Sequence, residues 1–403
     1  MREFIPFEDA RRLVVEAVPQ QPVVRVGLAD ALGRTLAQPV RSRDTIPPFD
    51  NSAMDGFAVR TADFADLPVV LSVLEDIPAG SVPQQEVQPG TCSRIMTGAQ
   101  FPSGADAVVP VEWTEPAGEG RIRFLRAPTP GQHVRQAGRD ITDGQLVFAP
   151  GQRVTPPVVG MLATLGFAAV DVRVPPHVAV ISTGNELVDA AMTPGPGQIR
   201  NANGPALAAQ VTSAGGVSFP PLLARDDEAH IRAVIEQALA ADMLVFSGGV
   251  SVGDYDFVKQ VLDAMGMELV FWKVQQRPGK PLAFGLLQGK PVFGLPGNPV
   301  SSAMCFEQYV RPALAQMLGR QEVFAPLHPA RLTAPTRKMA GLHYFARGHA
   351  TVDAEGSLLV RDTGPQGSHL YSSVVQANCI FHMPPEMESP APGTQVLVEW
   401  LRW

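Results

Sequence analysis

The segment VAVISTGNEL, residues 178–187, sets four consecutive apolar residues directly before a polar turn that contains Gly184. A continuous apolar run is typical of a strand that is buried on both faces of a parallel sheet. The segment MLVFSGG, residues 243–249, repeats this pattern. Segments with helical periodicity accompany these runs at residues 204–214, 228–240 and 257–265. The sequence therefore predicts a doubly wound, parallel α/β domain over residues 174–323.

The residues outside this domain predict three further parts. Apolar residues at helical spacing near the N-terminus and again at 156–165 predict a discontinuous helical/linker domain, formed by residues 1–45 and 147–173. In this interpretation the first residues, MREFIPFEDARRLV, are already helical. Short apolar runs that alternate with Gly/Pro turns predict an inserted small β domain over 46–146. Strand-like runs after Pro326 predict a C-terminal β-barrel domain over 324–403.

Composition limits the function classes. The 403-residue chain has a net charge of −7, which argues against a nucleic-acid partner because phosphate backbones require a broad positive face. Its apolar runs are shorter than the ~18 residues that a membrane span needs. Cys92, Cys305 and Cys379 are far apart in sequence, so neither a disulfide framework nor a zinc site is indicated. We therefore expect a soluble, cytoplasmic protein.

Two glycine-containing loops follow the predicted strands. They are STGNEL at 182–187 and SGGVSVGDYD at 247–256. Ligands of parallel α/β sheets bind at the carboxyl ends of strands, where backbone N–H groups can approach a phosphate. The candidate phosphate-binding residues are Thr183, Gly184, Ser247, Gly248, Gly249 and Ser251. A tight turn without a ligand is the alternative for either loop alone, but the pair favours a phosphate site.

Carboxylates gather at the same predicted strand ends. Glu186, Asp226, Asp227 and Asp256 would supply hard oxygen ligands beside a phosphate site, a combination that predicts a bridging Mg²⁺. For Asp226 and Asp227 the alternative is capping of the helix that begins near Glu228. The eight histidines show no metal-ligand spacing.

Three cations lie in a proline-rich loop of the same domain. The segment KVQQRPGKP, residues 273–281, contains Lys273, Arg277 and Lys280, and GLPGNPVSS follows at 294–302. A solvated basic face is the ordinary explanation for such a cluster. However, prolines and a glycine make the loop rigid, and a rigid loop holds cations at low entropic cost. The pattern therefore predicts an oxyanion pocket.

Asp55 and Thr97 lie in turn-like segments of the predicted β domain, DNSAMDG at 50–56 and RIMTGA at 94–99. Side-chain hydrogen bonds commonly close turns of this composition. Their residue chemistry alone does not separate a structural role from a functional one.

Taken together, these motifs resemble the MoeA family of molybdopterin molybdenumtransferases, which includes the C-terminal part of gephyrin. The resemblance rests on DNSAMDG, RIMTG, STGNEL, residues 247–253, PGKP at 278–281 and GLPGNPVS, and it continues through residues 364–373 and 377–378. It implies an enzyme of molybdenum cofactor biosynthesis. Such an enzyme inserts molybdenum from molybdate into adenylylated molybdopterin, releases AMP and uses Mg²⁺.

The resemblance also implies site roles and partners. The implied catalytic residues are Asp55, Thr97, Glu186, Asp256, Lys273 and Lys280, and the implied metal ligands are Glu186, Asp226, Asp227 and Asp256. Binding of the pterin, phosphate and molybdate would fall to the loop residues named above together with Arg277, Pro281, Ser301, Arg347, Ser368 and Ser372. The implied assembly is a homodimer, in which Asp55 and Thr97 act on a ligand held by the partner subunit. The adenylyltransferase that makes the substrate and the recipient molybdoenzymes are the implied protein partners.

Three residues depart from the family pattern, and two other functions remain open. Arg277 stands where Lys is common, and Asn185 and Asn201 replace acids. The α/β domain also resembles a molybdopterin adenylyltransferase, although a single-domain adenylyltransferase would lack the other three parts. A non-catalytic scaffold of the gephyrin type is the third interpretation.

Overall fold

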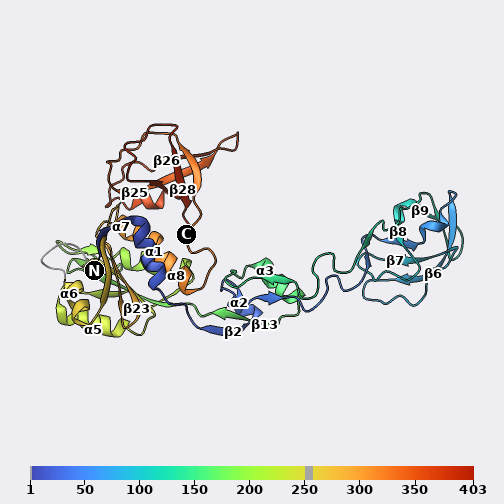
Figure 1. Cartoon of the computed structure of the whole chain (residues 1–403), viewed down its shortest axis with the longest axis horizontal. Coiled ribbons are helices and arrows are strands. Elements are labelled where there is room, and N and C mark those ends of the chain that lie inside the picture. Colours follow the sequence, from blue (N-terminus) through green and yellow to red (C-terminus); the bar gives the residue numbers. More distant parts are fainter. Residues whose placement is uncertain (1, 250–256) are drawn as a thin grey trace. The chain divides into compact units, whose positions relative to one another are not determined.

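The structure, a computed structural model, describes residues 2–249 and 257–403, and the chain divides into two compact units (Figure 1). The first unit comprises Met1–Gln38, Pro150–Gly160 and Ala168–Trp403, and the second comprises Pro39–Ala149 and Met161–Phe167. None of the helices in the described residues has the length and apolar character needed to cross a membrane. The predicted domain boundaries, 1–45 with 147–173, 46–146, 174–323 and 324–403, remain predictions.

An eight-stranded sheet forms the α/β part of the first unit. Its order is β1-β20-β22-β23-β19-β14-β17, and β18 also pairs with β14. The strands are β1 (Arg2–Ile5), β14 (His177–Thr183), β17 (Val217–Ser218), β18 (Leu222–Ala224), β19 (Met243–Ser247), β20 (Glu268–Val274), β22 (Ala283–Leu287) and β23 (Lys290–Leu295). The predicted α/β fold is confirmed.

One strand of this sheet departs from the prediction of a wholly parallel arrangement. β22 pairs antiparallel with both β20 and β23. Only Gln288 and Gly289 connect β22 to β23, with φ angles of 53° and 75°. Two central residues with positive φ form the tight hairpin turn that matches the twist of antiparallel strands, so this connection excludes a parallel crossover.

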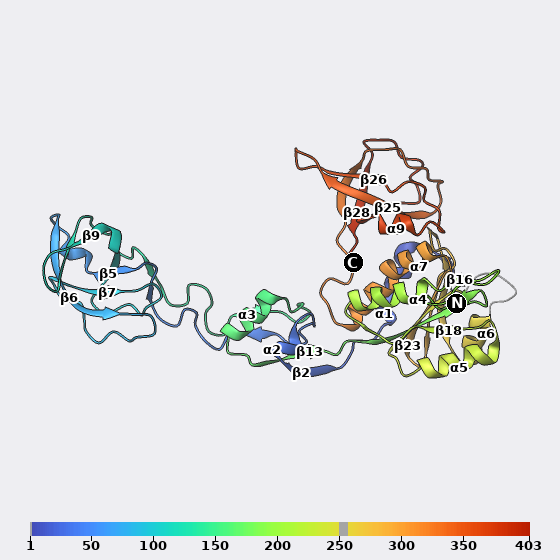
Figure 2. The ribbon, with the colours of Figure 1, turned by 180° about the vertical axis from the view of Figure 1, so that it is seen from behind.

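Helices cover both faces of the sheet because its strands alternate their buried side chains. Val178 and Val180 of β14 belong to one apolar core, whereas Ala179 and Ile181 belong to the other. The first core is closed by α1 (Phe7–Ala17), α4 (Asn203–Ser213), α7 (Pro299–Cys305), a π-helical turn (Phe306–Val310) and α8 (Arg311–Met317). The second core is closed by α5 (Glu228–Ala238) and α6 (Phe257–Ala264), which lie on the opposite side of the sheet in both views (Figures 1 and 2). The result is a three-layer arrangement.

The N-terminal segment differs from the predicted continuous helix. Residues Arg2–Ile5 form β1, which pairs in parallel with β20, and α1 begins only at Phe7. Pro6 stands between them, and a proline biases the residue before it toward extended backbone. Phe7, Ala10 and Val14 on one face of α1 are buried in the first core.

The C-terminal part forms the predicted barrel. Its strands are β24 (His328–Leu332), β25 (His343–Val352), β26 (Leu358–Asp362), β27 (Cys379–Met383) and β28 (Gln395–Trp400), and α9 (Ser372–Val375) precedes β27. Pairing of β25 with both β26 and β27 closes the sheet. A further strand, β21 (Gln276–Arg277), comes from the α/β part and pairs in parallel with β25. The sheet of the barrel therefore includes two residues of the proline-rich loop 273–281, for which an oxyanion pocket was predicted. We call this segment the oxyanion loop.

Short elements complete the first unit. β2 (Val23–Gly27) pairs antiparallel with β13 (Ala169–Arg173), although a helical pattern was expected for these N-terminal residues. α2 spans only Leu28–Ala31, and β15 (Leu187–Val188) pairs with β16 (Ile199–Arg200). The predicted helix near residue 156 is confirmed as α3 (Pro156–Thr164), whose residues are divided between the two units at Gly160.

The second unit contains the predicted β module. A six-stranded sheet has the order β8-β5-β7-β6-β10-β9 and surrounds an apolar core that includes Phe57, Leu71 and Phe124. These strands are β5 (Gly56–Val59), β6 (Val69–Ile77), β7 (Thr91–Ile95), β8 (Ala107–Pro110), β9 (Thr114–Pro116) and β10 (Arg121–Phe124). Two small pairs are added, β3 (Val40–Arg41) with β12 (Leu146–Phe148) and β4 (Asn51–Ser52) with β11 (Val134–Arg135), and single 3₁₀ turns lie at Thr61–Asp63 and Val111–Trp113.

Candidate functional site

Three loops meet at the carboxyl ends of β14, β19 and β23, which are parallel neighbours in the sheet. The backbone N–H of Gly248 donates to the Leu295 carbonyl at 3.1 Å. The Asn203 side-chain amide, at the start of α4, donates to Ser247 Oγ and to the Gly297 carbonyl, both at 2.8 Å. The described start of the second predicted phosphate loop, Ser247 and Gly248, is therefore joined by hydrogen bonds to the Leu-Pro-Gly-Asn-Pro loop, and Gly248 also lies against Thr183 of the first loop.

Glycine is required where these loops approach β14. Gly248 has φ of +94°, and a Cβ there would lie 2.8 Å from the Thr183 carbonyl oxygen. A Cβ on Gly249, with φ of +66°, would lie 2.8 Å from Thr183 Oγ1. That hydroxyl is buried and finds no hydrogen-bond partner among the described residues. Since buried polar atoms are normally paired, it is free to bind a ligand oxygen.

The predicted acids have unequal surroundings. Asp227 caps α5, because its Oδ1 accepts from the His230 backbone N–H at 2.8 Å. The helix-cap alternative therefore holds for this residue, and a metal role would have to use its other oxygen. The Glu186 carboxylate folds over Gly184, where a Cβ would lie 2.5 Å from its Oε2. Within residues 2–249 and 257–403, no three His, Cys, Asp or Glu side chains converge on a metal position. Ser251 and Asp256 lie outside the described residues.

Asn185 and Asn201 have defined structural partners. Asn185 Oδ1 accepts from the Asp226 backbone N–H at 3.2 Å and so joins the loops after β14 and β18. Asn201 Oδ1 accepts from Ser182 Oγ and from the Gly204 backbone N–H, both at 3.0 Å. An amide oxygen suits these donors without adding charge beside the candidate phosphate site.

A buried polar cluster packs against the inner side of the oxyanion loop and supports it. Gln276 is fully buried, and its Nε2 donates to the Gly279 carbonyl at 3.0 Å. The Tyr309 hydroxyl, on the π-helical turn, donates to Gln276 Oε1. Gly279 has φ of +90°, and a Cβ there would lie only 2.3 Å from Cys305 Sγ. Burial raises the pKa of the Cys305 thiol to about 12, so this cysteine is a neutral packing group.

Each predicted cation of this loop lies against an aromatic ring. Lys273 Nζ is 3.8 Å from the centre of the Trp272 ring, Lys280 Nζ is 4.9 Å from that of Phe4, and the Arg277 guanidinium is 5.6 Å from that of Tyr344. Arg277 and Lys280 are exposed. Lys273 also pairs with Glu3 Oε1 at 2.9 Å. Rings attract cations without neutralising them, so Arg277 and Lys280 keep charge for a ligand.

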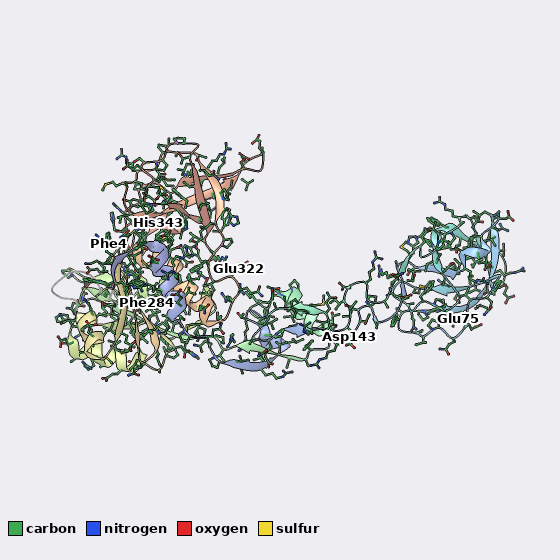
Figure 3. The ribbon with its side chains drawn as sticks, viewed as in Figure 1. Phe4, Glu75, Asp143, Phe284, Glu322 and His343 are labelled. Carbon is green, nitrogen blue, oxygen red and sulfur yellow. The ribbon has the colours of Figure 1, made fainter. Side chains whose placement is uncertain are left out.

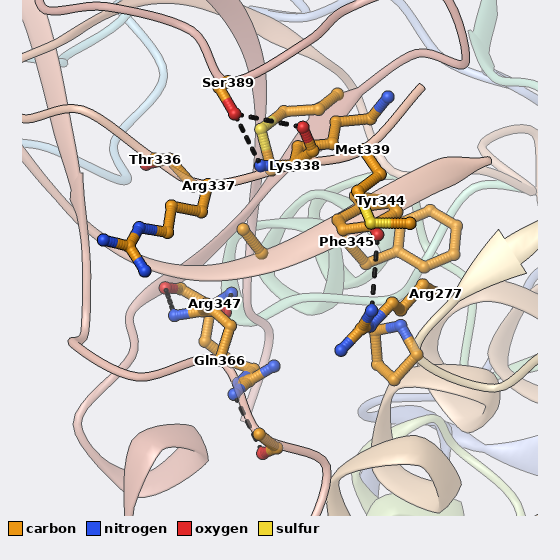
Figure 4. A pocket seen from close by; sticks show the side chains of 14 residues that line it. Arg277, Thr336, Arg337, Lys338, Met339, Tyr344, Phe345, Arg347, Gln366 and Ser389 are labelled. Carbon is orange, nitrogen blue, oxygen red and sulfur yellow. Dashed lines mark hydrogen bonds between the residues drawn. The ribbon is translucent and has the colours of Figure 1, made fainter. Parts of the chain in front are cut away.

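A pocket of about 560 Å³ lies where this loop meets the barrel (Figure 4). Arg277 and Pro278 line it from the loop, and the barrel contributes further cations, Arg337, Lys338 and Arg347. The Lys338 ammonium donates to the Met387 carbonyl at 2.6 Å. Sequence reasoning missed Arg337, Lys338 and Tyr344, because their motif, TRKMAGLHY, resembles an ordinary basic loop until the barrel places it beside Arg277.

Arg347 lines this pocket, but its guanidinium is already hydrogen-bonded to other residues of the protein. It is almost fully buried, its Nε donates to Ser373 Oγ at 3.0 Å, and a terminal nitrogen donates to the Gly367 carbonyl at 3.2 Å. Burial lowers the pKa of its guanidinium to about 10. Its hydrogen bonds hold the loop before α9 in place, while its positive charge lies beside the pocket.

The predicted serines occupy the boundary between α7 and the barrel. Ser301 is buried in the first turn of α7, and Ser372 is exposed at the start of α9. The Val300 backbone N–H donates to the Ser368 carbonyl at 3.3 Å, which brings these two segments together. Pro281 is half-buried directly after Lys280.

Asp55 and Thr97 meet in the second unit. Asp55 Oδ1 accepts from the Thr97 hydroxyl at 2.6 Å and from its backbone N–H at 2.7 Å. These bonds, that of the hydroxyl first, lower the pKa of the Asp55 carboxyl. The pair therefore presents an ionised, oriented carboxylate at the surface of the β module.

Comparison with known proteins covers almost the whole chain. Three family models match: "MoeA N-terminal region (domain I and II)" at residues 5–166, "Probable molybdopterin binding domain" at 179–316 and "MoeA C-terminal region (domain IV)" at 329–401. The chain is 38% identical to molybdopterin molybdenumtransferase 2 of Mycobacterium tuberculosis, over 97% of this chain and 98% of that protein. The chain belongs to the MoeA family.

Further relatives agree with this membership. The molybdopterin molybdenumtransferase of Haemophilus influenzae is 36% identical over 98% of both chains. A crystal structure of the molybdopterin biosynthesis MoeA protein from Pyrococcus horikoshii OT3 superposes with a TM-score of 0.84 at 30% identity, over 99% of this chain and 100% of that one. The resemblance inferred from the motifs is confirmed, as is the multidomain α/β fold of this MoeA protein.

Proposed function

We propose that this MoeA protein is a molybdopterin molybdenumtransferase, which inserts molybdenum from molybdate into adenylylated molybdopterin and releases AMP. The observation that carries the proposal is the full-length match to all three MoeA regions, together with relatives that bear this name at 36–38% identity. The fold and the chemistry of its loops support the same reaction.

The edge formed by the three strand-end loops is the proposed phosphate-binding surface. The backbone N–H groups of Gly184 and Gly248 already donate to the Ala224 and Leu295 carbonyls, so the proposed donors are the Gly249 backbone N–H and the unpaired Thr183 hydroxyl, with Ser247 beside them. Oriented backbone N–H groups stabilise phosphate oxygens without the entropic cost of ordering long side chains. Ser251 is proposed to complete this set.

The oxyanion loop and its pocket are the proposed site for molybdate and the pterin. Molybdate is a tetrahedral dianion, so it suits the exposed charges of Arg277 and Lys280. The volume of about 560 Å³ beside Arg277 also accommodates a small heterocycle. Lys273, Pro281, Ser301, Arg347, Ser368 and Ser372 are proposed to shape the same site. The positive charges hold molybdate against the dithiolene thiols, and as the two sulfurs bind molybdenum one molybdate oxygen leaves as water with the two thiol protons.

The acids after β14 and β18 are the proposed Mg²⁺ ligands. Glu186, Asp226 and Asp227 supply hard oxygen donors that fit Mg²⁺ in kind, and the orphaned Thr183 hydroxyl adds another; Asp256 is proposed as a further ligand. Bound Mg²⁺ would neutralise phosphate oxygens and polarise the mixed anhydride. The loop residues themselves orient the anhydride, so that water or a molybdate oxygen attacks its phosphorus and AMP leaves.

A homodimer in the cytoplasm completes the proposal. As the resemblance implies, Asp55 and Thr97 are proposed to act on a ligand held by the partner subunit. Three free, buried cysteines accord with a reducing compartment. The adenylyltransferase upstream and the recipient molybdoenzymes downstream are the proposed protein partners.

One assay tests the reaction. Purified protein is incubated with adenylylated molybdopterin, Mg²⁺ and molybdate, and AMP release is followed with and without molybdate. We expect AMP release that depends on both Mg²⁺ and molybdate. Formation of adenylylated molybdopterin from ATP would instead identify an adenylyltransferase. If the protein forms neither AMP nor adenylylated molybdopterin, the scaffold interpretation is the one that remains.

A second assay tests the dimer. Light scattering gives the mass, and Asp55→Ala protein is then mixed with Lys280→Ala protein after reversible dissociation. Partial recovery of activity in the mixture is expected, because one site of the mixed dimer then carries both intact residues. A monomeric mass, or a mixture no more active than its components, contradicts action across the dimer.

A further inference from the structure

Five arginines surround a small polar cavity in the first unit, away from the strand-end loops. They come from separate segments: Arg11 from α1, Arg153 from the residues before α3, Arg311 from α8, Arg320 from the turn after α8, and Arg402 from the C-terminal residues. The cavity has a volume of about 80 Å³. Glu322, which also lines it, is labelled in Figure 3 on the segment that leads from α8 to the barrel. We call this set the arginine cavity.

The acids of the arginine cavity are already engaged. Glu307 accepts from Nε and a terminal nitrogen of Arg311, at 2.5 and 2.9 Å. Glu399 accepts from Gln308 at 2.9 Å and lies 3.2 Å from His382 Nε2. Glu322 is exposed and lies 3.7 Å from Arg402.

Three arginines of the cavity, Arg11, Arg153 and Arg320, have no acid within ion-pair distance in the part of the chain that the structure describes. Five arginines and three glutamates leave an excess of two positive charges. This local excess stands out in a chain whose net charge is −7.

Arg320 shows the imbalance most clearly. Desolvation, followed by the positive charges of Arg153, Arg311 and Arg402, lowers the pKa of its guanidinium to about 10. One terminal nitrogen packs so closely on Gly215 that a Cβ there would lie 2.4 Å from it. Its Nε is buried and, among the described residues, has no hydrogen-bond partner. The Nε of Arg11 is in the same state.

A guanidinium that is partly removed from water is unfavourable without a counter-charge, so proteins normally pair it. Arg11 gains partial compensation, because its guanidinium lies 4.0 Å from the centre of the Phe324 ring. Arg320 has no such ring contact, and no acid lies within ion-pair distance of it in the described part of the chain, while the charges that lower its pKa are those of other arginines. The missing partner must be an anion, and it must be small, because about 80 Å³ holds a few waters or one tetrahedral ion.

We propose that the arginine cavity is a second, structural binding site for one small tetrahedral oxyanion, held by Arg320 and enclosed by Arg11, Arg153, Arg311 and Arg402. The cavity is too small for a nucleotide or a pterin, which separates it from the substrate site. A bound oxyanion would connect the end of α8, the segment before α3 and the C-terminal residues. Free phosphate or sulfate, or the substrate anion molybdate, has the required chemistry.

Anion-dependent stability tests the site. Thermal midpoints of the full chain are measured in chloride buffer of constant ionic strength, with millimolar phosphate, sulfate or molybdate added, and calorimetry counts the sites. Arg320→Gln removes the central cation. Arg153→Gln is the second variant, because this arginine is exposed and its loss should not prevent folding. Arg12→Gln is the matched control, since Arg12 neighbours Arg11 on α1 but points to solvent.

The wild type and Arg12→Gln are expected to gain at least ~2 °C with phosphate, because a ligand that binds the native state raises its midpoint. Arg320→Gln should lose that gain, and Arg153→Gln should reduce it. In chloride alone, Arg320→Gln should be as stable as the wild type or more so, because it removes like-charge repulsion. An equal gain with all three oxyanions indicates a general tetrahedral site, whereas a gain with molybdate alone indicates a second substrate site.

Lys280→Ala separates this proposal from the proposed function. If the oxyanion effect disappears in Lys280→Ala and persists in Arg320→Gln, the anion binds at the substrate loop and the proposal is wrong. An equal oxyanion effect in every variant would reflect general salting-out, which also overturns it. No effect in the wild type does the same. Failure of AMP release would leave all of these outcomes unchanged.

Discussion

The oxyanion loop and the arginine cavity are both rich in cations, but they hold them in opposite ways. Arg277 and Lys280 are exposed, and each lies against an aromatic ring. Arg320 is half-buried, its Nε is removed from water, and neighbouring arginines lower the pKa of its guanidinium. In the first region solvent and rings stabilise the charges, so a ligand can arrive and leave. In the second, the buried Nε atoms of Arg11 and Arg320 have no hydrogen-bond partner among the described residues.

This difference predicts that the oxyanion loop exchanges its ligand, whereas the arginine cavity retains a bound anion. A substrate site must release its product, and exposed cations release an anion because water replaces it at low cost. A desolvated guanidinium gains much more from an anion and therefore gives it up reluctantly. Cation number alone does not distinguish these roles. Burial and the presence of acids do.

Removal of the main counter-charge from the arginine cavity should give the largest effect. Glu307→Gln leaves Arg311 without its carboxylate, and a broken buried pair costs about 3–5 kcal/mol. We expect a lower thermal midpoint in chloride and a larger recovery with phosphate than in the wild type. Glu322→Gln is the control, because its exposed pair at 3.7 Å should contribute less than ~1 kcal/mol. Equal losses in both variants would contradict the distinction between buried and exposed pairs.

The next largest effect should come from the oxyanion loop itself. Gly279→Ala places a Cβ 2.3 Å from Cys305 Sγ at a φ of +90°, and strain with overpacking should cost about 2–4 kcal/mol and most of the AMP release. Gly289→Ala is the matched control, because its φ is +75° but no atom lies within 4 Å of its Cβ position. It should lose only ~1 kcal/mol and keep its activity. If both variants behave alike, the close packing on Cys305 does not position the loop.

Loss of one exposed cation should affect molybdate more than the pterin. Lys280→Ala removes a charged donor, so we expect the molybdate concentration for half-maximal AMP release to rise about tenfold or more. The phosphate-dependent midpoint should not change. Lys259→Ala serves as the control. Like Lys280, Lys259 lies over an aromatic ring, in its case that of Trp272, but it belongs to α6. An unaltered molybdate requirement in Lys280→Ala would mean that the pocket has been assigned wrongly.

The smallest effect should follow from the Arg277 support. Tyr344→Phe removes a hydroxyl that accepts from Arg277 at 3.4 Å but keeps the ring, so activity should change less than about twofold. Tyr344→Leu removes the ring, and a loss of roughly 0.5–1 kcal/mol should weaken molybdate binding severalfold. Steady-state kinetics with varied molybdate compares the two variants. A larger effect in Tyr344→Phe would assign the support to the hydroxyl.

Patterns in neighbouring residues predicted those structural features that depend on interactions between residues close in sequence. The continuous apolar runs at 178–181 and 243–246 are buried strands, and Gly248 and Gly249 lie where backbone must approach closely. The Asp227 cap also follows from its place directly before α5. Predictions failed where a distant segment decides the outcome. Residues 2–5 look helical alone, yet β20 offers them an open edge.

The candidate site shows the same limit. The sequence indicated Arg277 and Lys280 through their rigid loop, but no local pattern relates Lys338 or Tyr344 to them. The arginine cavity was not foreseen at all. Arg11, Arg153 and Arg320 are more than a hundred positions apart, and only the tertiary fold brings them to one cavity.

The parallel pairing of β21 with β25 limits how this enzyme can be recombined with its relatives. A chimaera that exchanges only the C-terminal barrel would pair a foreign β25 with native Gln276 and Arg277. The segment that must be exchanged to transfer the barrel is therefore longer than the barrel's own sequence. A working exchange has to carry the loop around β21 together with the barrel, so residues 273–281 and the barrel are expected to be inherited as one piece.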